Sequence, residues 1–163
     1  MRRHENRHRH RGRDRRPARR TTGSAPAPPP SSLPSVDGTR VVLVGYFSVK
    51  EKNVGALMDS AATELTARGA RIAGRFVQRR GVSDGGAAKT ALPFSSRTLL
   101  RSGKLREVAA ACEAVRADAA VFVTPLTDLQ RRTLTARPGC PASSLVEALD
   151  ANRPSPPAPA PAP

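Results

Sequence analysis

A continuous aliphatic run, Arg40–Tyr46 (RVVLVGY), is the feature that most constrains the fold of this chain. The run is short and rich in Val, and polar and apolar residues do not alternate along it. That pattern is typical of a strand buried on both faces, as in a parallel sheet covered by helices on each side. The sequence therefore predicts an α/β domain around this strand.

Three further segments are predicted as strands. Ala70–Gln78 and Asp118–Thr124 (DAAVFVT) follow helical patterns, and Cys140–Ser143 is a short fourth candidate. Side chains alternate between the two faces of a strand. In the first segment we expect Ile72, Gly74, Phe76 and Gln78 on one side and Arg71, Ala73, Arg75 and Val77 on the other.

Helical patterns lie between these strands. Asn53 is placed to cap a first helix, and Gly69 to end it in the left-handed conformation. Ser102 is placed to cap a second helix, after a loop over Arg79–Ser95 and a brief extended stretch over Thr98–Arg101. The apolar stripes predicted to face the core are Val54, Leu57, Met58, Ala61 and Leu65 in the first helix and Leu105, Val108, Ala109, Cys112 and Val115 in the second.

Two capping boxes predict the remaining helices. Thr127 with Gln130 opens one helix, which Pro138-Gly139 ends, and Ser144 with Glu147 opens the other. Strands that alternate with helices form right-handed βαβ units. The predicted fold is thus a small parallel sheet of about four strands with flanking helices.

The two ends of the chain differ from its centre. Residues 1–37 hold mainly Arg, His, Pro and Ser, and residues 153–163 are a Pro-Ala repeat. Such segments bury too little apolar surface to offset the entropy of ordering, so we predict disordered tails on a domain spanning residues 38–152.

Several classes of site and of protein are disfavoured. The two cysteines, Cys112 and Cys140, have no metal-ligand spacing, and no apolar run approaches the ~20 residues of a membrane span. The predicted domain has no His, no nucleophile elbow and no paired carboxylates. We therefore expect a cytoplasmic protein that is not an enzyme, holds no cofactor or metal and does not bind membranes.

The net charge indicates a polyanionic partner. The chain carries a formal charge of +15, of which the tail over residues 1–37 contributes +7 and the remainder +8. The predicted domain is thus basic without its tail. Nucleic acid is the commonest partner of such a domain, although a genome rich in G and C also inflates Arg, Ala and Pro.

The positive charge is densest between Arg68 and Arg106. Ten cationic residues lie in these 39 positions, against one acidic residue, Asp84. In a parallel sheet, the carboxyl end of a strand and the start of the next helix share one edge. The residues expected to bind RNA or phosphate there are Arg79, Arg80, Arg101 and Lys104 on one rim, with Gln78, Arg97, Gly103 and Arg106 beside them.

Ser102-Gly103-Lys104 resembles part of a phosphate loop. The full motif needs Gly at position 98 and Ser or Thr at 105, where this chain has Thr98 and Leu105. What remains is a helix start that attracts phosphate, or a tight helix start with a solvated Lys104. Phe94 is either a base-stacking residue or an anchor of its loop.

A series of short blocks resembles the N-terminal domain of HflX-type ribosome-associated GTPases. The blocks span roughly Arg40 to Ser144 and are, in order, Tyr46-Phe47-Ser48, Lys52-Asn53, Leu57, Gly69-Ala70, Gln78-Arg79-Arg80, Ser102-Gly103-Lys104, Glu107-Val108, Ala117-Asp118, Val121-Phe122, Leu126-Thr127, Gln130-Arg131 and Leu134. The chain departs from the family at Arg101, where the family has the first Gly of G-x-G-K. It departs again at Ala142-Ser143-Ser144, which replaces D-R-T.

This resemblance implies an α/β domain that binds the RNA of the large ribosomal subunit. In the family, a helical hairpin and a GTPase domain follow, whereas this sequence continues into its Pro-Ala repeat. The function predicted is non-catalytic binding of ribosomes or ribosomal RNA, with a regulatory role in translation or stress. The alternatives are a nucleotide-sensing module using Gly103-Lys104 and a protein-interaction module that partners a separate GTPase.

Overall fold

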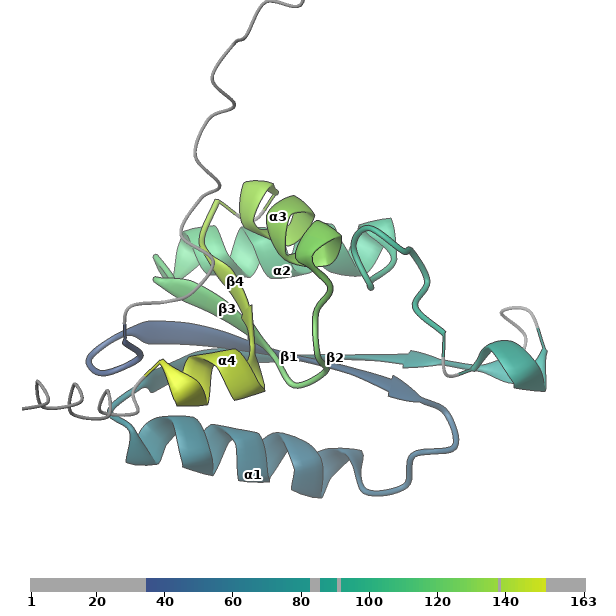
Figure 1. Cartoon of the computed structure of the whole chain (residues 1–163), viewed down its shortest axis with the longest axis horizontal. Helices are drawn as coiled ribbons and strands as arrows, with labels where there is room; N and C mark the ends of the chain where they lie inside the picture. The colour runs from purple at the N-terminus through teal and green to yellow at the C-terminus, as the bar shows by residue number, and fades with distance from the viewer. Residues whose placement is uncertain (1–34, 83–85, 91, 138, 152–163) are drawn as a thin grey trace, which may run out of the picture.

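The computed structural model describes residues 35–82, 86–90, 92–137 and 139–151. Within them, four parallel strands form one sheet in the order β2-β1-β3-β4, which confirms the predicted α/β fold (Figure 1). The strands are β1 (Arg40–Ser48), β2 (Arg71–Arg80), β3 (Ala119–Phe122) and β4 (Ala142–Ser144). Most of both predicted tails lies outside the described residues.

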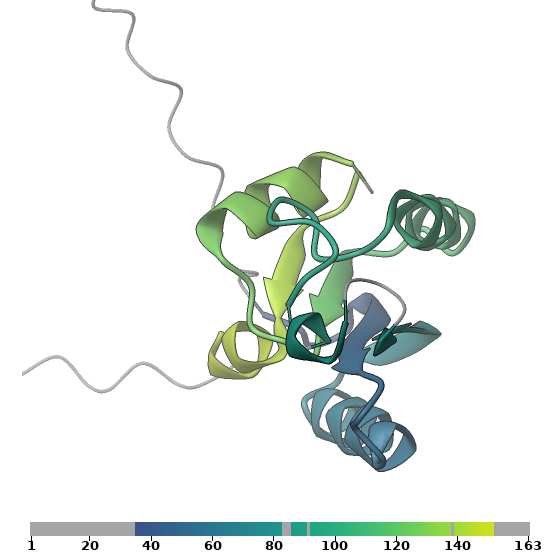
Figure 2. The same cartoon turned by 90° about the vertical axis from the view of Figure 1, so that its right-hand side faces the viewer.

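Helices cover both faces of this sheet, as the two views show (Figures 1 and 2). Helices α1 and α4 pack on one face, and α2 and α3 on the other. The helices are α1 (Val54–Ala67), α2 (Ser102–Ala114), α3 (Asp128–Ala136) and α4 (Leu145–Asp150), with a 3₁₀ turn, η2, at Ala87–Lys89. None of the helices in the described ranges is long and apolar enough to cross a membrane.

The aliphatic run lies at the centre of the fold. Strand β1 pairs with both β2 and β3, and its side chains enter two separate cores. Val42, Val44 and Tyr46 face α2 and α3, whereas Val41 and Leu43 face α1 and α4. Burial on both faces explains why the run has no polar alternation.

A bulge near the start of β2 changes the predicted alternation of its side chains. Val41 pairs with Ile72 but Val42 pairs with Gly74, so β2 has one extra residue at Ala73. An extra residue moves the side chains on one side of a bulge to the opposite face. Ile72 therefore packs on the α1 side with Val77, and the prediction that it shares a face with Phe76 is wrong.

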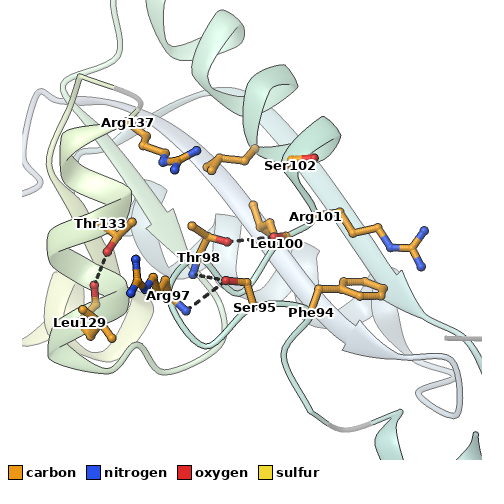
Figure 3. Close-up of a pocket in the computed structure, with 11 residues that line it drawn as sticks. Phe94, Ser95, Arg97, Thr98, Leu100, Arg101, Ser102, Leu129, Thr133 and Arg137 are labelled. Carbon is orange, nitrogen blue, oxygen red and sulfur yellow. Dashed lines mark hydrogen bonds between the residues drawn. The ribbon is translucent and has the colours of Figure 1, made fainter. Parts of the chain in front are cut away.

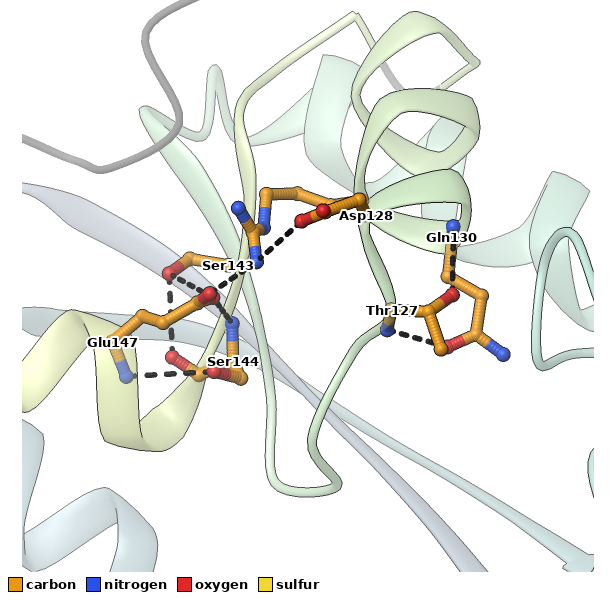
Figure 4. Close-up of polar contacts among 7 residues, drawn as sticks. Thr127, Asp128, Gln130, Ser143, Ser144 and Glu147 are labelled. Carbon is orange, nitrogen blue, oxygen red and sulfur yellow. Dashed lines mark hydrogen bonds and ion pairs between the residues drawn. The ribbon is translucent and has the colours of Figure 1, made fainter.

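Local signals placed most helix ends correctly. Gly69 has φ +88° and, with Ala70, returns its N–H to the last turn of α1, which forms a Schellman motif. Both predicted capping boxes are present, at Thr127 with Gln130 and at Ser144 with Glu147 (Figure 4). The Arg131 guanidinium pairs with both Asp128 and Glu147, which ties α3 to α4.

Other local predictions were wrong. Arg101, not Ser102, is the N-cap of α2. Asn53 is the N-cap residue of α1, as predicted, but its side chain makes no capping hydrogen bond. The segment before α2 is a turn rather than extended, because Leu99 takes φ +64° and its N–H bonds to the Ser95 carbonyl. Leu57 is 40% exposed and lies outside the core.

Three more positions bear on where the predicted domain, strands and helices begin or end. Val36, which was assigned to the tail, is fully buried in the core between the sheet and α1 and α4. Asp118 accepts the Arg40 N–H and so joins the starts of β3 and β1, in keeping with a role at the start of its strand. Pro138, half of the predicted stop signal, lies outside the described residues, and Gly139 has φ +72°.

Candidate nucleic-acid interface

The carboxyl end of β2 is joined directly to the start of α2. The Oε1 atom of Gln78 accepts the backbone N–H of Arg101 at 3.0 Å. Arg101 is the N-cap residue, so this bond fixes where the helix begins. Gln78 and Arg101 thus lie together, but the side-chain carbonyl oxygen of Gln78 is already used within the protein.

Arg79 and Arg80 point away from each other because neighbouring side chains on a strand alternate. The Nη2 atom of Arg79 donates to the carbonyls of Val49 and Glu51 at 2.7 and 2.6 Å, which fastens the loop between β1 and α1. The Arg79 side chain stays exposed. These two hydrogen bonds hold the Arg79 guanidinium in one orientation, which fixes the directions of its remaining N–H groups.

Arg80 is buried and holds the loop on the other side of β2. It is 9% exposed, and its Nη1 donates to the carbonyls of Leu92 and Pro93 at 3.0 and 2.6 Å. Its guanidinium carbon lies 4.9 Å from the centre of the Phe94 ring. A phosphate would reach this guanidinium only after the loop moved, so the structure gives Arg80 a structural role.

Phe94 anchors the loop that leads to α2. Its ring packs edge-on against Tyr46, with 5.9 Å between ring centres, and the Tyr46 hydroxyl donates to the Leu92 carbonyl. The Arg101 guanidinium carbon lies 4.3 Å from the Phe94 ring centre. Of the two alternatives left by the sequence, the structure favours the loop anchor, with Arg80 and Arg101 stacked on one ring.

The start of α2 offers less free charge than its sequence suggests. Lys104 Nζ pairs with Glu107 Oε2 at 2.7 Å, one turn further along the helix. Gly103 faces open space, since a Cβ placed there has no neighbour within 4 Å. Arg106 is exposed on the same helix. The predicted phosphate site at Gly103-Lys104 thus has a lysine whose charge is already partly balanced.

A groove between the 94–101 loop, α2 and α3 collects the exposed cations instead (Figure 3). Its volume is about 680 Å³, and among the described residues that line it are three arginines and no acidic residue. Arg97 and Arg101 come from the loop, and Arg137 from the end of α3. The full lining is Phe94, Ser95, Arg97, Thr98, Leu100, Arg101, Ser102, Leu105, Leu129, Thr133 and Arg137.

A tight turn positions Arg97 at this groove. The Ser95 Oγ atom accepts the N–H groups of Arg97 and Thr98 at 3.1 and 3.2 Å. Thr98 is 9% exposed, and its hydroxyl donates to the Leu100 carbonyl. Because the backbone is fixed on both sides of it, Arg97 presents its exposed side chain without the cost of ordering a loop.

Sequence reasoning missed Arg137. It lies outside the basic stretch, and helical residues near it, such as Gln130 and Leu134, face the core. The available signal was its place in the last turn of a predicted helix, after Leu129 and Thr133 at helical spacing on the same face. Only the placement of α3 on the same face of the sheet as α2 brings it to the groove that Arg97 lines.

The chemistry of the groove is binding of anions. Guanidinium groups give paired N–H donors to phosphate oxygens, and the lining residues that the structure describes include no acid that would compete for them. In the described part of the chain, no group of three or more His, Cys, Asp or Glu side chains is arranged to hold a metal ion. Both cysteines are buried, and a hydrogen bond with Cys112 together with burial raises the pKa of Cys140, which keeps that thiol protonated.

No protein-family model and no curated protein matches this sequence. The resemblance to HflX N-terminal domains therefore stays a prediction. One of its more specific blocks, Thr127 to Arg131, has a structural role here, as a capping box and as the tie between α3 and α4.

Proposed function

We propose that this chain is a non-catalytic, cytoplasmic RNA-binding domain that binds ribosomal RNA on the large ribosomal subunit. The observation that carries the proposal is the groove whose described lining residues include Arg97, Arg101 and Arg137 and no acidic residue. Such a surface binds a polyanion by releasing its condensed counterions. The resemblance of the sequence blocks to HflX N-terminal domains favours ribosomal RNA as that polyanion.

Three features of the fold support a binding role. The groove is built on turns and helix ends that hydrogen bonds hold in place, so little entropy is lost when a ligand binds. Arg101 rests on the Phe94 ring, which orients its guanidinium plane. Arg106 extends the positive surface along α2. The residues proposed to contact RNA are therefore Arg97, Arg101, Arg106 and Arg137.

Co-sedimentation with purified large ribosomal subunits tests this proposal. The full chain is run on sucrose gradients at low and at high salt, and we expect it to migrate with the subunit at low salt and to dissociate at high salt. Failure to migrate with the subunit at low salt contradicts the proposal.

A pair of double variants separates the groove from charge in general. Arg97→Ala with Arg137→Ala removes two groove cations and should abolish most of the co-migration. Arg40→Ala with Arg71→Ala removes the same charge from exposed positions at the starts of β1 and β2 and should leave it intact. The basic tail is present in both variants, so equal losses in the two would show that the groove has no special role.

A further inference from the structure

The groove has an apolar wall, which binding of phosphate alone does not explain. Leu100 and Leu105 lie at its base as buried members of the core, whereas Leu129 lines it with 53% of its surface exposed. A phosphate gains nothing from a leucine side chain, whereas the face of a nucleotide base gains from burial against it. The mixture of cations and leucines indicates a ligand with both an anionic and an apolar part.

The cations are arranged around this wall. Figure 3 shows Arg137 above the groove and Arg97 below it, with Thr98 and Leu100 between them in the view. Thr133 lies on the α3 side, and its hydroxyl donates to the Leu129 carbonyl at 2.8 Å. The Thr133 oxygen therefore still accepts a hydrogen bond, which suits an amino group of a base or a ribose hydroxyl.

The size of the groove restricts the ligand further. Its 680 Å³ falls within the range of about 300–1,000 Å³ that is usual for small-molecule sites. A double helix keeps its base faces inside the stack and presents only its backbone and the edges of its grooves. It can contact the arginines at the rim but cannot place a base face on Leu129.

We infer that the groove binds one unpaired nucleotide of the RNA, an inference that rests on the proposed function. The base lies against the exposed side chain of Leu129, and Arg97 and Arg137 contact its own phosphate and ribose. Arg101 lies beside Phe94 at the edge of the groove and takes the phosphate of the next nucleotide (Figure 3). Extruded bases in RNA are commonly recognised by such combinations of stacking and guanidinium contacts.

Two labelled RNA hairpins of equal length and charge test this inference. One carries a single bulged nucleotide in its stem, and in the other every stem nucleotide is paired. Fluorescence anisotropy with the full chain at one fixed salt concentration gives both affinities, and we expect the bulged hairpin to bind about tenfold more tightly. Equal affinities overturn the inference that the groove binds an unpaired nucleotide. Absence of binding to both hairpins at low salt overturns the proposed function instead.

A matched pair of leucine variants locates the base. Leu129→Ala should reduce the preference for the bulged hairpin about fivefold and leave the paired hairpin unaffected. Leu57→Ala removes an exposed leucine from α1, on the opposite face of the sheet, and should change neither affinity. Equal effects of Leu129→Ala on both hairpins overturn the inference, since the leucine would then not distinguish a base from a backbone.

A competition experiment identifies the source of the nucleotide. A free nucleoside monophosphate lacks the flanking phosphates for Arg101, so millimolar concentrations should displace the bulged hairpin only weakly. Displacement by micromolar monophosphate overturns RNA as the ligand and assigns the groove to a free nucleotide.

Discussion

Substitution of Arg80 tests whether this cation stabilises the fold or binds RNA. Sequence reasoning placed it with the RNA contacts, whereas the structure buries it under the loop that carries Phe94. If the structure is right, Arg80→Ala mainly lowers the free energy of unfolding. If Arg80 is a phosphate contact, the substitution mainly lowers RNA affinity.

The size of the effect follows from the bonds that are lost. Two hydrogen bonds join a charged guanidinium to the carbonyls of Leu92 and Pro93, and hydrogen bonds of this kind contribute about 1.5–3 kcal/mol each. The contact with Phe94 adds about 1 kcal/mol. Burial of the guanidinium offsets part of this gain, so we expect the free energy of unfolding to fall by about 2–4 kcal/mol.

Urea denaturation followed by circular dichroism measures this change, with Arg79→Ala as the control. Arg79 is exposed, so its loss should cost no more than about 1 kcal/mol. Arg80→Lys keeps the charge but not the paired donors, and it should be nearly as unstable as the alanine variant. A change below about 0.5 kcal/mol for Arg80→Ala, together with a loss of RNA binding that lysine restores, would refute the structural role.

Three further predictions concern the fold. Gly69→Ala should lower the melting temperature by several degrees, because φ is +88° there and an L side chain is strained in that conformation; an unchanged melting temperature contradicts this. Ser144→Ala should lower the free energy of unfolding by about 1 kcal/mol in urea denaturation, because the N–H of Glu147 loses its acceptor. Thr63→Ala, at an exposed position of α1, should lower it less. The hydrogen bond between the two cysteines lowers the pKa of Cys112 and raises that of Cys140. Once Cys112 is ionised in both states, only the unfolded chain still loses the Cys140 proton, so stability should fall as pH rises above about 8.5. Cys140→Ala should flatten that fall in a series of denaturation curves from pH 7 to pH 10, and an unchanged slope would assign it to other groups.

Signals that act within a few residues were predicted well. The capping boxes at Thr127 and Ser144 and the left-handed Gly69 depend on backbone geometry within one turn, and all three are present. Ser102 shows the limit of such reasoning. The Arg101 N–H donates a long-range hydrogen bond to Gln78, and α2 begins one residue earlier than the sequence predicts. Tertiary contacts of this kind leave no mark in the local sequence.

The candidate site was predicted only in part. Arg97 and Arg101 are exposed at the groove, but Arg80 is buried, Lys104 is paired with Glu107, and Arg137 was not anticipated. Charge density along the chain identifies a basic segment, but it does not say which side of a strand or loop each cation occupies.

The sequence by itself determined that this is an α/β domain around a central strand, since Val41–Val44 is continuously aliphatic and leaves no polar residue for an exposed face. It also determined that the chain is strongly basic, because 28 Lys and Arg residues stand against 13 Asp and Glu residues. Only the tertiary structure decided where that charge is available. The turn over residues 95–100 and the placement of α2 and α3 on one face of the sheet bring Arg97, Arg101 and Arg137 to one groove. That placement depends on contacts between segments that are far apart in the chain.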